Sequence, residues 1–197
     1  MLAFAALAAA LSASSAMATP LKRATPGPSC DGLGSGAFDT SSSFTLAAYN
    51  TTGPNANSTG APLVLGTAGV VQQTQIWHFI TEESWGSYPI TYPTVSLQNG
   101  TLILHSDGAT PTQATTVDAG NSLEFVARTS ADPSAGAQIY CAVQGDAGLP
   151  LLAVNNDADS FSLCQTTFEN VVYYKAAPDR GYDFDSCYPV KLQILFQ

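Results

Sequence analysis

Two histidines and two pairs of neighbouring carboxylates are the side chains most suited to acid–base chemistry in this chain. Nucleophilic catalysis needs a base beside the nucleophile. His78 and His105 both lie in runs with strand character, and the chain has no Gly-x-Ser-x-Gly turn. On an alternating strand His78 faces the opposite way from Trp77 and Phe79. We therefore expect His78 to be a polar residue on the outer face of a sheet.

The carboxylates do not form a clear catalytic pair. Glycoside hydrolysis needs two carboxyl groups about 5–10 Å apart. Glu82 and Glu83 would point to opposite faces of a strand. Asp183 and Asp185 would share a face if extended, but the turn residues Arg180-Gly181 favour a solvated loop, and no calcium-loop pattern surrounds them. We predict no catalytic residue and no cofactor, and a hydrolase using Glu83 or Asp183 stays an alternative.

One aromatic segment has the composition of a binding surface. Residues 84–93 carry Trp85, Tyr88 and Tyr92 among glycines and prolines, next to Glu83. Proline and glycine indicate a loop, and loops lie at the surface. Exposed rings stack on the C–H face of a sugar, and carboxylates accept hydrogen bonds from its hydroxyls. These four residues are the predicted ligand site; the alternative is that the rings plug one end of a β core.

The four cysteines suggest two disulfides. An even number of cysteines in an oxidising compartment favours pairing, and four cysteines allow three connectivities. Proximity in the sequence favours Cys164–Cys187, which leaves Cys30–Cys141. No C-x-x-C spacing occurs and only two histidines are present, so we predict no metal site.

The N-terminus is typical of a secreted protein. Residues 1–18 form a short apolar run that ends in a small-x-small cleavage pattern, Ala16-Met17-Ala18. Lys22-Arg23 resembles the dibasic site of a kexin-type processing protease. We expect a signal peptide at 1–18, a pro-segment at 19–23 and a single domain at 24–197, secreted or associated with a cell wall.

Charge excludes two classes of partner. The chain has 15 acidic and 6 basic residues, a net charge of −9. A nucleic-acid binder needs clustered Lys and Arg to neutralise phosphates, and an anionic membrane would repel an acidic surface. No later apolar run is long enough to span a membrane. We expect neither nucleic acid nor a membrane as a partner.

Three Asn-x-Ser/Thr sequons predict N-glycosylation. They begin at Asn50, Asn57 and Asn99. The first two lie in a polar loop over residues 50–60, which suits a glycan. Asn99-Gly100 also has the composition of a tight hairpin turn, which competes with glycosylation.

The sequence predicts an all-β fold. Short β-branched, aromatic and aliphatic runs alternate with Gly, Pro, Asn, Asp and Ser, whereas a helical period is absent after the signal peptide. Twelve runs favour an antiparallel barrel, trefoil or sandwich. They are 44–49, 63–65, 75–80, 94–97, 101–105, 114–117, 123–127, 138–143, 151–154, 161–164, 171–174 and 190–195.

A loose threefold repeat favours the β-trefoil among these folds. Apolar runs that follow Gly60, Gly100 and Gly148 are spaced by 40 and 48 residues. Gln75-Ile76-Trp77 resembles the Gln-x-Trp element of the ricin-B-like lectins, and this resemblance implies a trefoil. The alternative is an antiparallel sandwich or jelly roll.

As a whole the chain resembles the uncharacterised small secreted proteins of basidiomycete fungi. The resemblance rests on the signal peptide, Lys22-Arg23 and the block from Phe44 to Gly66. It implies an extracellular or cell-wall setting and no particular activity. We expect a non-catalytic glycoprotein that binds a glycan or cell-wall polysaccharide. The alternatives are a structural surface glycoprotein without a specific ligand, a carboxylate-based glycoside hydrolase and a protease inhibitor.

Overall fold

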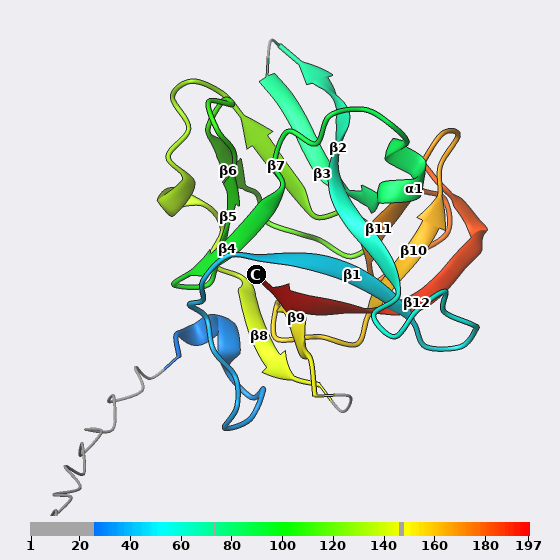
Figure 1. Cartoon of the computed structure of the whole chain (residues 1–197), viewed down its shortest axis with the longest axis horizontal. Helices are drawn as coiled ribbons and strands as arrows, with labels where there is room; N and C mark the ends of the chain where they lie inside the picture. The colour runs from blue at the N-terminus through cyan, green and yellow to red at the C-terminus, as the bar shows by residue number, and fades with distance from the viewer. Residues whose placement is uncertain (1–25, 73, 146–147) are drawn as a thin grey trace, which may run out of the picture.

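A closed barrel of six antiparallel strands is the centre of the molecule (Figure 1). The computed structural model describes residues 26–72, 74–145 and 148–197, so the expected signal peptide and pro-segment lie outside it. Around the barrel the strand order is β1-β2-β3-β11-β10-β12, and β12 pairs back with β1. These strands are β1 (Phe44–Asn50), β2 (Ala61–Val71), β3 (Thr74–Thr81), β10 (Phe161–Gln165), β11 (Asn170–Tyr174) and β12 (Asp183–Phe196).

Six further strands extend the barrel sheet. The β4–β5 hairpin joins β1 through the pair Phe44–Val95, β7 pairs with both β3 and β6, and the β8–β9 hairpin joins β12 through Gln193–Leu151. Their bounds are β4 (Thr94–Gln98), β5 (Thr101–His105), β6 (Thr112–Ala114), β7 (Glu124–Ala127), β8 (Tyr140–Gln144) and β9 (Pro150–Val154).

Within residues 26–72, 74–145 and 148–197, helical structure is limited to three single turns. They are η1 (Pro28–Cys30), α1 (Glu82–Trp85) and η2 (Pro133–Ala135). Among the described residues, no helix has the length and apolarity that a membrane crossing requires. All-β structure is therefore confirmed, and each of the twelve predicted runs overlaps one of the twelve strands.

The threefold plan of a trefoil is not confirmed. The barrel takes its strands from two blocks, the first three and the last three of the chain, rather than evenly from three repeats. The segments that follow Gly60, Gly100 and Gly148 accordingly take different places. The first enters barrel strand β2, whereas the other two enter β5 and β9, which lie outside the barrel. The described strands belong to one sheet, of which six strands close into the barrel, rather than to the two sheets of a sandwich.

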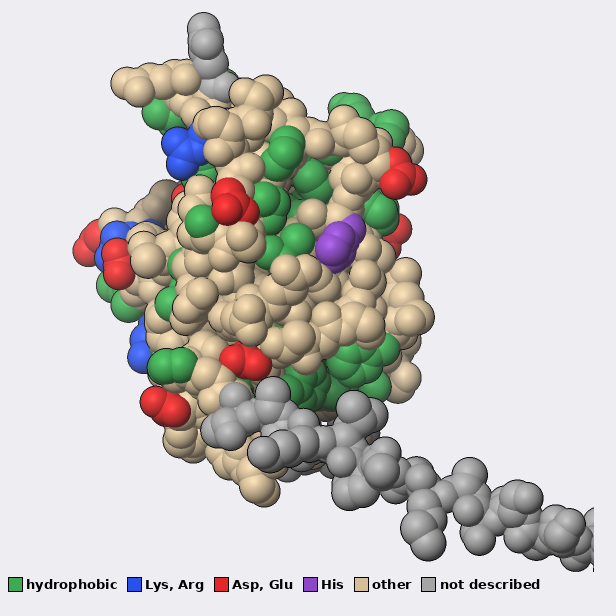
Figure 2. Space-filling model, turned by 90° about the vertical axis from the view of Figure 1, so that its left-hand side faces the viewer, with side chains coloured by type: hydrophobic (Ala, Val, Ile, Leu, Met, Phe, Trp, Pro, Cys, Tyr) green, Lys and Arg blue, Asp and Glu red, His purple; other side chains and the backbone are tan. Residues whose placement is uncertain are grey.

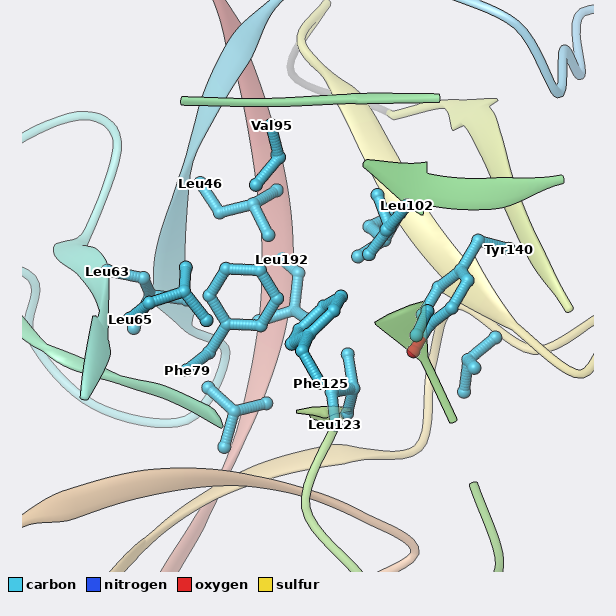
Figure 3. Packing of buried hydrophobic residues seen from close by; sticks show 14 of the residues in the cluster. Leu46, Leu63, Leu65, Phe79, Val95, Leu102, Leu123, Phe125, Tyr140 and Leu192 are labelled. Carbon is cyan, nitrogen blue, oxygen red and sulfur yellow. The ribbon is translucent and has the colours of Figure 1, made fainter. Parts of the chain in front are cut away.

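Alternation along the barrel strands builds one core. In β3, Trp77 and Phe79 join the main buried cluster, and in β12, Leu192 and Ile194 do the same. The inserted strands contribute to this cluster too, because Phe125 of β7 packs edge-on against Phe79 at 5.5 Å between ring centroids. Figure 3 shows these rings with core residues from both parts of the sheet, namely Leu46, Leu63, Leu65, Val95, Leu102, Leu123, Tyr140 and Leu192. Barrel and insertions therefore fold around a shared interior.

The β4–β5 connection is the tight hairpin that the sequence predicts. Asn99 and Gly100 both have positive φ, 48° and 79°, as a two-residue hairpin turn requires. The Gly100 amide donates to the Asp39 carbonyl oxygen, and a Cβ at Gly100 would lie 2.6 Å from the Ser29 hydroxyl oxygen. Glycine is therefore required here by backbone conformation and by space.

Two disulfides form, with the pairing that sequence proximity favours. Cys30–Cys141 ties η1 to β8 across 111 residues, and Cys164–Cys187 ties β10 to β12 across 23 residues. The two disulfides therefore connect elements that are separated in the sequence. On the face shown in Figure 2, charged side chains are scattered and neither sign gathers into a patch.

Replacing Phe125 by alanine should lower the free energy of unfolding by about 3–5 kcal/mol, because a fully buried ring leaves a cavity in the shared core. Phe168→Ala is the matched control. Phe168 is 88% exposed, so its loss should change stability by less than about 0.5 kcal/mol. Urea denaturation measures both values, and equal losses in the two variants would contradict the shared core.

Removing Cys30–Cys141 should cost more stability than removing Cys164–Cys187. The longer cross-linked loop restricts the unfolded chain more, which gives about 5 kcal/mol for 111 residues and about 3 kcal/mol for 23 residues. Double cysteine-to-alanine variants of each pair, compared by thermal melting, test this ranking. The reverse order, or a melting temperature that reductant leaves unchanged, would contradict it.

Candidate functional site

The aromatic segment begins with a helical turn rather than a loop. Thr81 caps α1, since its hydroxyl oxygen accepts a hydrogen bond from the Ser84 amide, 3.3 Å away. The Ser84 hydroxyl oxygen in turn accepts from the Asn170 amide of β11 at 2.9 Å. Glu82 and Glu83 project from the first turn and are exposed. This turn is thus anchored to the barrel, and Glu83 faces solvent.

The three predicted aromatic ligands do not share one exposed face. Tyr88 is 72% exposed, and Trp85 is half-buried against the core with 5.6 Å between the two ring centroids. Tyr92 is only 4% exposed, packs edge-on against Trp77 and donates its hydroxyl hydrogen to the Thr110 carbonyl oxygen at 2.7 Å. Tyr92 is therefore a core residue. Ligand binding by Glu83, Trp85 and Tyr88 stays a prediction.

The aspartates lie in strand β12 rather than in the expected loop. Asp183 begins β12 and pairs with Gln165, after a register shift in the β10–β12 ladder. Asp183 and Asp185 are both exposed, and the Asp183 carboxylate accepts a hydrogen bond from the Asp185 amide at 3.1 Å. The Asp183 carboxylate therefore stabilises the local backbone of β12.

His78 faces outward from the barrel as predicted, but it is buried instead of exposed. Trp77 and Phe79 point into the core, whereas His78 and Ile80 lie on the opposite face of β3. That face is covered by the β10–β11 turn and by the chain around Tyr182, so His78 is only 7% exposed. A polar group is thus enclosed on the outside of the barrel.

His78 lies on the wall of a cleft of about 590 Å³, which we call the polar cleft. Strands β3, β7 and β11 form its base, and two connections, residues 166–169 and 180–182, form its rim. Its chemistry comes from six side chains, His78, Glu124, Phe168, Glu169, Tyr173 and Tyr182, with Arg180 at the edge. Sequence reasoning did not find this group because its members come from four separate parts of the chain.

Two glutamates flank the imidazole. The Nε2 atom of His78 lies 3.3 Å from the Glu169 carboxylate, and Glu124 is the cross-strand neighbour of His78 in the β3–β7 ladder. Burial lowers the pKa of His78 below its ordinary value, although both glutamates act to raise it. The imidazole is therefore neutral at neutral pH and does not cancel the charge of either carboxylate.

Aromatic rings line the other side of the polar cleft. The rings of Tyr173 and Tyr182 pack against each other, with 3.9 Å between centroids and 37° between planes, and the Tyr182 hydroxyl oxygen accepts from the Ala177 amide. Burial, together with Tyr182 and the two glutamates, raises the pKa of Tyr173 to about 12. Phe168 stands at the rim and is almost fully exposed. The polar cleft thus pairs ring faces with carboxylate acceptors.

Local structure holds the rim in place. The β10–β11 turn is closed by the Thr166 amide on the Glu169 carbonyl oxygen at 2.7 Å and by the Glu169 amide on the Thr166 hydroxyl oxygen at 3.1 Å. Cys164–Cys187 packs in the same outer cluster as Tyr173 and Tyr182. The Arg180 guanidinium donates to the Ala119 carbonyl oxygen at 3.2 Å. These contacts position the cleft residues before any ligand arrives.

A second hollow, of about 710 Å³, lies against β9 and β12. Its charged groups are already paired, since Lys191 bonds to Asp159 and Lys175 lies 3.5 Å from Asp157. Within the described ranges, no group of three or more His, Cys, Asp or Glu side chains is arranged to hold a metal ion. Because the charged groups at the second hollow neutralise one another, we take the polar cleft as the candidate ligand site.

The buried state of His78 should make the protein less stable in mild acid. The unfolded chain takes up a proton at His78 near pH 6.5, whereas the folded chain does so only at lower pH, so the free energy of unfolding falls as pH drops below about 6.5. His78→Gln removes this contribution. The stability gap between wild type and variant, measured by urea denaturation, should shrink from about pH 7.5 to about pH 5; parallel pH profiles would contradict this.

Comparison with known proteins supplies no relative from which a function could be transferred. The chain matches no protein-family model, no curated protein and no solved structure. The resemblances to basidiomycete secreted proteins and to ricin-B-like lectins therefore stay predictions. What the protein does has to be argued from the residues of the polar cleft.

Proposed function

We propose that this protein is an extracellular, non-catalytic glycan-binding protein and that the polar cleft is its binding site. The observation that carries the proposal is that aromatic rings and half-buried carboxylates line one cleft of about 590 Å³. Sugars present an apolar C–H face and a rim of hydroxyl groups. Phe168 and Tyr182 offer surfaces for the first, and Glu124 and Glu169 offer acceptors for the second.

The internal pairing of the cleft suits binding rather than proton transfer. Nε2 of His78 is engaged by Glu169, and the Ser122 hydroxyl donates to Glu124 at 3.0 Å. These bonds fix the carboxylates in direction while leaving further lone pairs for ligand hydroxyls. A preorganised set of acceptors loses little side-chain entropy when a ligand binds.

Several features support an extracellular setting. Residues 1–18 have the composition of a signal peptide, and both disulfides are of the kind that persists in an oxidising compartment. The surface position of two sequons adds to this. Asn57 is exposed and Asn50 is half-buried, both at the polar loop between β1 and β2.

The first two sequons have a local geometry that supports their glycosylation. In each, the side-chain amide oxygen Oδ1 of the asparagine accepts from the threonine hydroxyl two residues later, at 3.3 Å for Asn50 and 3.0 Å for Asn57. Asn99 instead occupies the first position of the β4–β5 turn with positive φ. We propose glycans at Asn50 and Asn57 first, and at Asn99 least.

A glycan array with three proteins tests the proposed function. Wild type should bind, and Phe168→Ala should weaken binding at least about tenfold because a stacking face is lost. Tyr88→Ala, which removes an exposed ring in the aromatic segment outside the polar cleft, should bind like wild type. Neither ring is buried, so both variants should fold.

Three outcomes would contradict the proposal. Loss of binding in Tyr88→Ala alone would place the site on the segment 82–93. No binding by wild type would favour the structural glycoprotein without a ligand. Release of reducing sugar ends from a bound polysaccharide would indicate a hydrolase.

A further inference from the structure

We infer that the ligand of the polar cleft is an amino sugar with free amines, as in fully deacetylated chitin. This inference rests on the proposed function and narrows it to a class of glycan. Three features of the cleft favour the same ligand chemistry: its negative charge, its aromatic rings and the partial burial of both. A sugar ring that carries an ammonium group is complementary to each of these features.

The lining of the cleft carries more negative than positive charge. Glu124 projects from β7 and Glu169 from the β10–β11 turn. At neutral pH, burial keeps His78 of β3 neutral, and burial also raises the pKa of Tyr173 of β11. Strand β2 contributes Thr67 and Ala68, which carry no charge.

Arg180 is the one cationic side chain among the described lining residues. Its guanidinium is turned toward the segment 119–120, where it donates to the Ala119 carbonyl oxygen. A Cβ on Gly120 would lie 2.7 Å from its Nε atom, so the guanidinium rests against that glycine. Arg180 therefore closes one edge of the polar cleft. Among the described residues it forms no ion pair with Glu124 or Glu169.

Partial burial makes this excess charge selective. The side chain of Glu169 is only 24% exposed, and Glu124 is half-buried. A carboxylate that has lost part of its hydration attracts a cation more strongly than an exposed one does. A neutral sugar would leave both carboxylates without a counter-charge, and a uronic acid would be repelled.

The rings favour a cation on a sugar over a simple cation. Aromatic faces attract ammonium groups and also stack on the C–H face of a pyranose ring. Phe168 at the rim and the tilted ring pair Tyr173–Tyr182 line the same cleft as the glutamates. We therefore expect a glucosamine unit to stack on Phe168 or Tyr182 and to direct its ammonium group toward the carboxylates.

Titration calorimetry with chain-length-matched hexamers tests the inference. The three ligands share a β-1,4-linked glucose-type backbone and differ at carbon 2, which carries a free amine, an N-acetyl group or a hydroxyl. At about pH 6, where sugar amines are protonated in large part, the amine hexamer should bind at least about tenfold more tightly than the other two. A higher salt concentration should weaken binding of the amine hexamer more than binding of the N-acetyl and hydroxyl hexamers.

Isosteric variants assign the charge to the cleft. Glu124→Gln and Glu169→Gln should each weaken amine-hexamer binding at least about tenfold, while their affinity for the N-acetyl hexamer changes little. Glu83→Gln is the matched control, because Glu83 is an exposed glutamate outside the cleft and its replacement should have no effect. A lysine hexamer of equal charge should bind at least about tenfold more weakly than the amine hexamer, because it lacks a ring to stack.

The outcomes separate this inference from the proposed function. Equal or tighter binding of the N-acetyl or hydroxyl hexamer would overturn the amino-sugar assignment and leave glycan binding standing. Equal binding of the lysine hexamer would also overturn it, by showing that charge alone is recognised. Failure of every hexamer, together with an array without hits, would overturn the proposed function and this inference together.

Discussion

The pairing of the first barrel strand with the last is the constraint on which the rest of the structure depends. Strands β1 and β12 form an antiparallel ladder from Phe44–Phe196 to Asn50–Val190. Until those distant segments meet, β1 and β12 each present an open edge, and the core residues of both strands have no enclosed interior to enter. The rings of Phe38 and Phe44 both contact Phe196, which adds apolar contact where the ladder begins. Bringing such distant segments together costs chain entropy, and the two disulfides reduce that cost by restricting the unfolded chain.

Closure also determines where a ligand can bind. Because large side chains such as Phe79, Phe125 and Tyr140 fill the shared interior, a ligand site has to lie on the outside of the barrel (Figure 3). The outer face of β3 and β11 is partly covered by the chain that leads into β12, which Cys164–Cys187 fastens to β10. That cover buries Ile80 completely but leaves a cleft around His78, two residues away on the same face.

The strands were predictable from the chain, whereas their assembly was not. Alternation and turn residues locate twelve runs, and Asn99-Gly100 predicts its hairpin, because these signals are local. The order of strands around the barrel depends on long-range pairing, so a loose repeat at Gly60, Gly100 and Gly148 pointed to a threefold plan that the strand order does not show.

Site prediction from the sequence was limited for the same physical reason. Aromatic residues close together in sequence appeared to form a surface, yet Tyr92 turns into the core because its ring fits against Trp77 and its hydroxyl finds the Thr110 carbonyl oxygen. The outward direction of His78 could be read from alternation. Its burial could not, since the residues that cover it, around Glu169 and Tyr182, lie about ninety or more positions further along the chain.

The polar cleft gathers polar and charged side chains on an outer face of the barrel where an apolar side chain also packs. On the outer face of β3, Ile80 shows that an apolar side chain packs well beneath the same cover. His78 instead loses hydration there, and its imidazole contacts the Glu169 carboxylate, which is itself partly desolvated. Burying polar and charged groups in this way costs free energy that an apolar residue would not. This cost, at His78, Glu124 and Glu169 together, supports the proposal that a ligand binds in the polar cleft.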